Sequence, residues 1–207
     1  MLRRENFLYV LSRSKTNADK SRLKTYSYQI GSSLGEGVCT ATIKDGDKTQ
    51  TVVVMKQRKS FAKQEGEDDF QTVAERIIDG NQSVIFLEHA LHAHLLRKTD
   101  GKHVAKLLFA DEDQFTFLVR GDRIVPVKVS KYYAPANPQK RDRQSRTKAS
   151  NDFKSAEKTV QDALNEYYAK GDARARDEDW KNKRNILVDG NNKCLFHDFD
   201  CSVASKK

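Results

Sequence analysis

The sequence predicts an α+β fold in which a five-stranded antiparallel sheet carries one helix and is followed by a smaller, mostly helical region. Three observations lead to this prediction. Short runs rich in β-branched and aromatic residues recur between residues 26 and 130. One amphipathic helix interrupts these runs. A basic stretch with two prolines then separates them from a second helix and a short hairpin.

The first region, residues 26–130, supplies the expected sheet. Its strand-like runs are residues 26–34, 39–43, 51–55, 104–109 and 115–119, and a turn at 120–123 leads into a further run at 124–129. Residues 57–71 are charged and predict a loop. Between residues 84 and 96 apolar side chains recur at helical spacing, which predicts a helix with one buried face.

The remaining segments complete the predicted organisation. Residues 1–25 are basic and polar, and we expect an extension with a short helix at Phe7–Leu11. Residues 131–150 combine Pro135 and Pro138 with many lysines and arginines, which favours a mobile linker or a binding site for an acidic partner. Residues 151–207 predict a helix from Asn151 and then a hairpin of residues 186–188 and 194–196.

Composition narrows the class of protein. The net charge of +9, from 38 Lys and Arg against 29 Asp and Glu, favours anionic partners such as nucleotides, lipids or acidic proteins. The three cysteines show no paired spacing, so neither a disulfide framework nor a zinc knuckle is expected. No apolar run is long enough to span a membrane, and no secretory signal peptide is evident.

Glycines interrupt the predicted sheet at a point where a backbone could approach a phosphate. Gly35 and Gly37 precede Val38, and a strand–turn–strand with glycines leaves no Cβ between the amides and phosphate oxygens. An ordinary hairpin would also explain two glycines. Thr40 occupies the position at which a Gly-x-Gly-x-x-Gly pattern would have its third glycine, which predicts a stiffer turn or a weaker phosphate contact.

Further polar residues follow at ordered positions. Lys56 ends the apolar strand 51–55. Two glutamates further along the chain are candidate partners for this lysine: Glu88, which lies within the apolar stripe of the helix, and Glu75. Near the end of the chain Asn185 precedes Asp198 by 13 residues. Oxygen ligands from Asn and Asp suit magnesium, which takes its other ligands from water and phosphate.

In order and spacing these residues resemble the protein-kinase superfamily, from about Tyr28 to Phe199. The resemblance implies a kinase-like N-lobe with a strongly reduced helical C-lobe. It implies that Gly35, Gly37 and Val38 cover the phosphates of ATP, and that Lys56 binds them while paired with Glu88. Asn185 and Asp198 would be ligands of Mg²⁺ or Mn²⁺. Asp200 stands where the family's Asp-Phe-Gly motif has glycine.

The catalytic loop of the family matches less closely. Asp179 precedes Asn185 by six residues, where the family has five. With one inserted residue Asp179 would orient the acceptor hydroxyl and Lys181 would offset charge on the transferring phosphoryl group. Asp177, after Arg176, is the alternative base. Only seven residues follow Asp200, so the later helices of ordinary kinases are expected to be missing.

The expected function is therefore an ATP- and metal-dependent phosphotransferase. The resemblance implies a protein Ser/Thr acceptor, because Lys181 follows Asp179 by two residues, as in kinases of that acceptor class. The alternatives are a pseudokinase interaction module and a kinase of sugars or lipopolysaccharide. Reduced kinases of this kind resemble bacterial effectors, which implies a virulence role and a cytoplasmic location, with delivery into a host cell as one route. Only the basic linker favours nucleic-acid binding.

The helix also carries three closely spaced histidines. His89, His92 and His94 include one pair at i, i+3, a spacing that can bring two metal ligands together. Neither a carboxylate nor a cysteine completes the set, so ordinary surface or partly buried histidines are the expected reading. His197, beside Asp198, is expected to be structural.

Overall fold

The structure is a computed structural model that describes residues 6–13, 21–45, 49–133, 143–169, 179–181, 186–188 and 193–199. Its internal contacts divide the chain into two compact units. The barrel unit comprises Met1–Ala90 and Leu107–Tyr132, and the helical unit comprises Leu91–Lys106 and Tyr133–Lys207. Each unit is described by itself.

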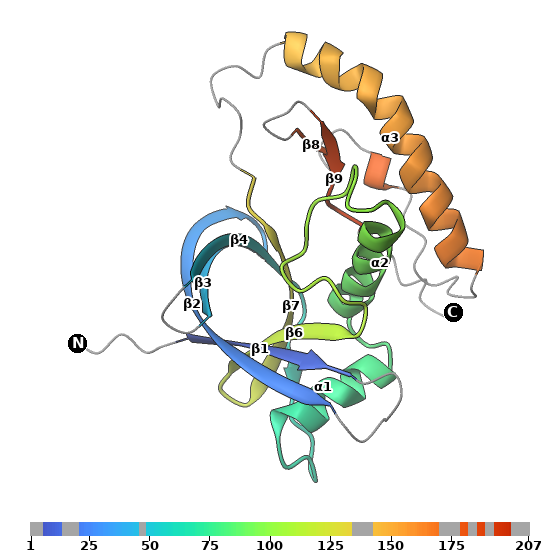
Figure 1. Cartoon of the computed structure of the whole chain (residues 1–207). Helices are drawn as coiled ribbons and strands as arrows, with labels where there is room; N and C mark the ends of the chain where they lie inside the picture. Colours follow the sequence, from blue (N-terminus) through green and yellow to red (C-terminus); the bar gives the residue numbers. More distant parts are fainter. Residues whose placement is uncertain are drawn as a thin grey trace. The chain divides into compact units, whose positions relative to one another are not determined.

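A closed antiparallel barrel forms the centre of the barrel unit (Figure 1). Its six strands are β1 (Asn6–Ser12), β2 (Arg22–Gly35), β3 (Val38–Asp45), β4 (Thr49–Gln57), β6 (Gln114–Arg120) and β7 (Arg123–Lys131). They run in the order β4-β3-β2-β1-β6-β7, and a pairing between β4 and β7 closes the ring. The two-residue strand β5 (Phe61–Ala62) pairs with β7 as well.

The predicted open, five-stranded kinase-like N-lobe sheet is therefore wrong. Strand β1 makes the difference, because it pairs with β2 on one side and with β6 on the other. The segment Phe7–Leu11, predicted as a short helix, is part of this strand. The strand is apolar on both faces because both are buried. Leu8 and Val10 pack into the barrel interior, whereas Leu11 packs into a second core outside the barrel wall.

Helix α1 (Phe70–Asp79) covers that second core. Asp69 caps the helix by accepting a 2.8 Å hydrogen bond from the backbone N–H of Thr72. Val73 and Ile77, one turn apart, are buried against aromatic side chains of β6. This helix was not predicted, although the capping Asp and the i, i+4 pair of apolar residues were signals for it.

The connection after helix α2 (Val84–Lys98) differs from the prediction too. The expected strand at 104–109 is absent from the described residues, which show only isolated bridges at Val104 and Leu107. The runs predicted at 115–119 and 124–129 do form a hairpin, as β6 and β7. Gly121 provides the left-handed backbone of its turn, with φ 62°.

The helical unit contains α3 (Arg143–Ala169), a 3₁₀ turn (Asp179–Lys181) and the hairpin β8 (Ile186–Val188) and β9 (Cys194–Phe196). The hairpin lies where the sequence predicts it. Helix α3 begins at Arg143, earlier than the expected start at Asn151, so part of the predicted linker is helical. Within this unit Phe196 packs against Trp180, with ring centroids 4.9 Å apart.

No helix in the described part of the chain combines the length and apolarity that a membrane crossing requires.

Candidate functional site

Three buried charged side chains form the most distinctive polar cluster of the barrel unit. The Lys56 ammonium lies 3.1 Å from Glu88 Oε2 and donates a 3.2 Å hydrogen bond to Oε1. The Lys128 ammonium also donates to Glu88 Oε1. Glu88 has no exposed surface, Lys128 is 3% exposed and Lys56 is 8% exposed. Ionised groups at this depth are retained only when they are paired, as these are.

The barrel places the two lysines by strand register. Lys56 on β4 is the direct cross-strand partner of Lys128 on β7. Because side chains alternate along a strand, both point away from the face that Met55 and Val129 turn into the barrel interior. Glu88 reaches them from the first half of helix α2. The ion pair expected between Lys56 and Glu88 is thus present.

The rival partner for Lys56 has its own contacts. Glu75 lies on helix α1, where its carboxylate accepts a 3.0 Å hydrogen bond from Gln71 Nε2, one turn earlier. This is an ordinary i, i+4 helix-surface contact. Between the two glutamates that the sequence offers, the structure pairs Lys56 with Glu88.

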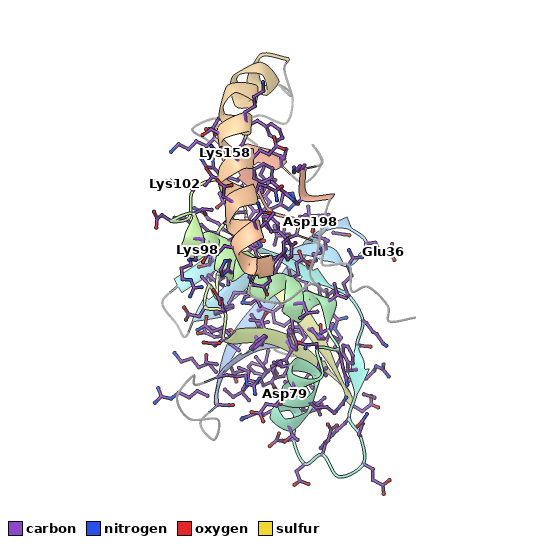
Figure 2. The ribbon with its side chains drawn as sticks, turned by 90° about the vertical axis from the view of Figure 1, so that its right-hand side faces the viewer. Glu36, Asp79, Lys98, Lys102, Lys158 and Asp198 are labelled. Atoms are coloured by element: carbon purple, nitrogen blue, oxygen red, sulfur yellow. The ribbon has the colours of Figure 1, made fainter. Side chains whose placement is uncertain are left out.

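The glycine turn between β2 and β3 lies against the strand that carries Lys56. Gly37 has φ 69°, and its carbonyl accepts a 2.8 Å hydrogen bond from the N–H of Gln57. A Cβ on Gly37 would lie 2.5 Å from the Gln57 carbonyl oxygen, so only glycine fits. Glu36, at the tip of the turn, is exposed (Figure 2). Val38 follows the turn and pairs directly with Lys56.

Thr40, at the position of the missing third glycine, binds the backbone of the neighbouring strand β2. Its hydroxyl accepts a 2.8 Å hydrogen bond from the N–H of Ser32 and donates to the Ser32 carbonyl at 3.3 Å. Strand β2 is irregular here, with register shifts on either side of Ser33. The hydroxyl occupies the space that a side chain on Gly31 would need. Thr40 therefore links the irregular part of β2 to β3 beside the glycine turn.

Asp198, the predicted metal ligand, belongs to the helical unit and is partly exposed there (Figure 2). It follows strand β9, and the next residue, Phe199, is fully buried. The ring of Phe199 packs edge-on against His92, with centroids 5.1 Å apart, so the backbone beside Asp198 is anchored. The second predicted ligand, Asn185, lies outside the described residues, as do Arg176, Asp177 and Asp200.

The predicted catalytic loop is described only at Asp179–Lys181, a single 3₁₀ turn. Trp180 anchors this turn, with 2% of its surface exposed. Lys181 is exposed, and its ammonium lies 3.2 Å from Glu157 of α3 and 5.3 Å from the centre of the Trp180 ring. The side chain of Asp179 lies outside the described part. Trp180 is therefore packed in the interior of the helical unit, and Lys181 is paired with a carboxylate.

The three histidines of α2 are buried, which is deeper than expected. His92 Nε2 lies 2.7 Å from the Ala105 carbonyl, and the His94 ring packs edge-on against Tyr167. Burial lowers the pKa of His89 to about 4, with a further contribution from the Lys128 charge and an opposing one from the Asp111 backbone. Among the described residues no group of three His, Cys, Asp or Glu side chains is placed to hold a metal.

Lys128 is a candidate functional residue that was not predicted from the sequence. The run Val125-Pro126-Val127-Lys128-Val129 has the alternation of a strand, in which a lysine ordinarily faces solvent. Its burial depends on Glu88, 40 residues earlier in the chain. The only signal in the sequence was a lysine inside an otherwise apolar strand-like run.

Comparison of the chain with protein-family models, with curated proteins and with solved structures finds no match.

Proposed function

We propose that this protein is an ATP-dependent phosphotransferase in which Lys56 binds the nucleotide phosphates. The observation that carries the proposal is the buried pair of Lys56 and Glu88 beside the glycine turn. Phosphoryl transfer depends on positioning and on stabilising charge, and an aimed lysine next to backbone that can approach a phosphate supplies both.

Lys56 suits this role because Glu88 holds its ammonium group while part of the side chain remains accessible to a ligand. Its side chain is 11% exposed, compared with none for Glu88. Glu88 fixes the direction of the ammonium, while the exposed fraction allows contact with an anion. Gly37 brings the turn close to the end of β4. The low dielectric of a nearly buried site strengthens a lysine–phosphate contact relative to the same contact in water.

The metal ligands of the proposal are Asp198 and Asn185. The donor chemistry fits: an aspartate carboxylate and an asparagine amide oxygen suit Mg²⁺ or Mn²⁺, which keep several waters and bind phosphate oxygens. Asp198 is partly exposed, as a ligand to an exchangeable ion must be, and buried Phe199 steadies its backbone. When bound, the ion offsets negative charge on the phosphates.

For the acceptor, Asp179 is the proposed base-like residue and a protein Ser or Thr hydroxyl the proposed nucleophile. Asp179 would orient this hydroxyl within hydrogen-bond distance and accept its proton. Trp180 holds the turn on which Asp179 lies, which supports this assignment. Asp179→Asn should keep ATP binding and lower phosphoryl transfer by a factor of about a hundred. Asp177→Asn should do little, and the reverse result would move the role to Asp177.

One observation favours a second candidate, a nucleotide-binding module without transfer activity. Lys181, expected to offset charge on the transferring phosphoryl group, is paired with Glu157. A lysine held by a carboxylate contributes less to that task. In this case Mg-ATP would bind, and no substrate would be labelled.

A single experiment separates these functions. The pure protein is incubated with γ-labelled ATP and Mg²⁺ or Mn²⁺, with protein lysates and glycan fractions in parallel. We expect label on proteins; label on glycans would identify a sugar kinase, and binding without label the inactive module. Lys56→Met should lower turnover at least tenfold, about 1.4 kcal/mol. Lys44→Met, at an exposed position of β3, is the matched control. Unchanged activity in folded Lys56→Met would contradict the proposal.

A further inference from the structure

Lys128 has no part in the proposed function so far, yet it shares the carboxylate that holds Lys56. Its side chain is 4% exposed, less than the 11% of Lys56. Both lysines contact Glu88, Lys128 through Oε1 and Lys56 through both oxygens. We propose that Lys128 is a positioning residue: it fixes the Glu88 carboxylate so that this carboxylate can aim Lys56. The inference rests on the proposed nucleotide-binding role of Lys56.

The register of the barrel makes this arrangement unusual. Direct cross-strand partners project from the same face, so Lys56 and Lys128 bring two positive charges together. Like charges in this position repel, and burial increases the repulsion. Glu88, placed to contact both ammonium groups, compensates for it. An apolar residue on β7 would avoid the repulsion, so the lysine at position 128 needs a reason beyond packing.

A second donor to Glu88 supplies that reason. If Lys56 alone held the carboxylate, Glu88 would lose an ion-pair partner whenever the Lys56 ammonium moved toward a phosphate. With Lys128 on Oε1, the carboxylate keeps a partner on a different strand. Glu88 then remains paired with strand β7 through Lys128, so the Lys56 ammonium always finds the carboxylate in the same position. Lys128 thereby acts through Glu88 without touching the nucleotide.

The test measures the affinity for a fluorescent ATP analogue, trinitrophenyl-ATP with Mg²⁺, in the full chain. Lys128→Met removes the ammonium group and keeps most of the length of the side chain, and it should weaken binding about tenfold. Lys128→Arg restores a donor and should recover most of the affinity. Lys131→Met, at an exposed position of the same strand, is the matched control and should bind as the wild type does. Circular dichroism and thermal melting identify the fraction of each variant that is folded.

The double variant Lys56→Met/Lys128→Met decides how Lys128 acts. If it acts only through Glu88 and Lys56, the double variant binds no more weakly than Lys56→Met alone. Losses that multiply would mean an independent phosphate contact and overturn the positioning role, as would wild-type affinity in folded Lys128→Met. Wild-type affinity in folded Lys56→Met, or a wild-type protein that does not bind the analogue, would overturn the proposed function and this inference with it. Loss in Lys56→Met without loss in Lys128→Met would overturn this inference alone.

Discussion

The two units position their candidate residues by different means. In the barrel unit Lys56, Glu88 and Lys128 come from two paired strands and a helix, and backbone register sets their places. In the helical unit the candidates lie on short segments, and buried aromatic residues next to them act as anchors. Trp180 separates Asp179 from Lys181, and Phe199 follows Asp198.

This difference predicts how each unit responds to substitution. A residue positioned by strand register depends on partners far away in sequence, so its substitution should destabilise several helices and strands at once. A residue on a short segment depends on the buried aromatic side chain next to it, so the substitution of this anchor should matter more than that of the charge beside it. The barrel unit should therefore be sensitive at its charges and the helical unit at its aromatics.

The largest effect is expected from Glu88→Ala. The substitution leaves two buried lysines facing each other without the carboxylate that they share. Removing one partner of a buried ion pair costs about 3–5 kcal/mol, and we expect the free energy of unfolding to fall by about this amount. Urea unfolding followed by circular dichroism measures it.

The matched control for this substitution is Glu75→Ala, at the glutamate on α1 whose hydrogen bond is to Gln71 in the same helix. It should change stability by less than about 0.5 kcal/mol. Equal losses in the two variants would mean that the buried cluster has no special importance for the barrel.

The parts of this site that depend on local sequence patterns could be predicted, and those that depend on contacts between distant parts of the chain could not. The ends of a strand and the stripe of a helix are local patterns, and they led to Lys56 and Glu88. The burial of Lys128 and the position of β1 between β2 and β6 depend on partners far along the chain, such as the pairing of Leu8 with Leu118. Local periodicity contains no information on such pairings, so the open sheet was predicted instead.

In the helical unit the short hairpin was predicted, because its two short strands and the turn signal between them are local features. The start of α3 was misplaced, since the basic residues before Asn151 suggested a linker. Arginine and lysine are good helix formers, and a charged segment can extend a helix that is anchored further on by Ala156 and Val160.

Trp180→Ala tests the anchors of the helical unit. The side chain is almost fully buried and packs against Phe196, so truncation creates a cavity. We expect a loss of about 3 kcal/mol in the stability of this unit. Lys181→Ala is the control at the neighbouring exposed residue and should be nearly neutral. Hydrogen exchange of the amides of β9 reports on the unit separately from the barrel; unchanged protection in Trp180→Ala would contradict the role of the anchor.

The pH dependence of stability gives a smaller effect in the barrel unit. Burial lowers the pKa of His89 from 6.5 to about 4, so the unfolded chain binds this proton more readily than the folded one. Stability is then unaffected above pH 6.5 and falls as the pH drops toward 4, by about 2 kcal/mol at pH 5. Urea unfolding at pH 7 and pH 5 measures the fall. His89→Phe should reduce it, and an equal fall in this variant would assign the effect to other groups.

The smallest effect concerns Thr40, which ties the bulge of β2 to β3. Thr40→Ala removes the hydroxyl that accepts from the Ser32 N–H and donates to the Ser32 carbonyl. Both Ser32 groups are near solvent and can bind water, so the loss of stability should be only about 1 kcal/mol. Thr40→Ser keeps the hydroxyl and is the matched control. Because the glycine turn adjoins this bulge, Thr40→Ala should also speed amide exchange at Gly37 and Val38, measured by mass spectrometry. Exchange as slow as in Thr40→Ser would mean that the turn is held by the contact of Gly37 with Gln57 alone.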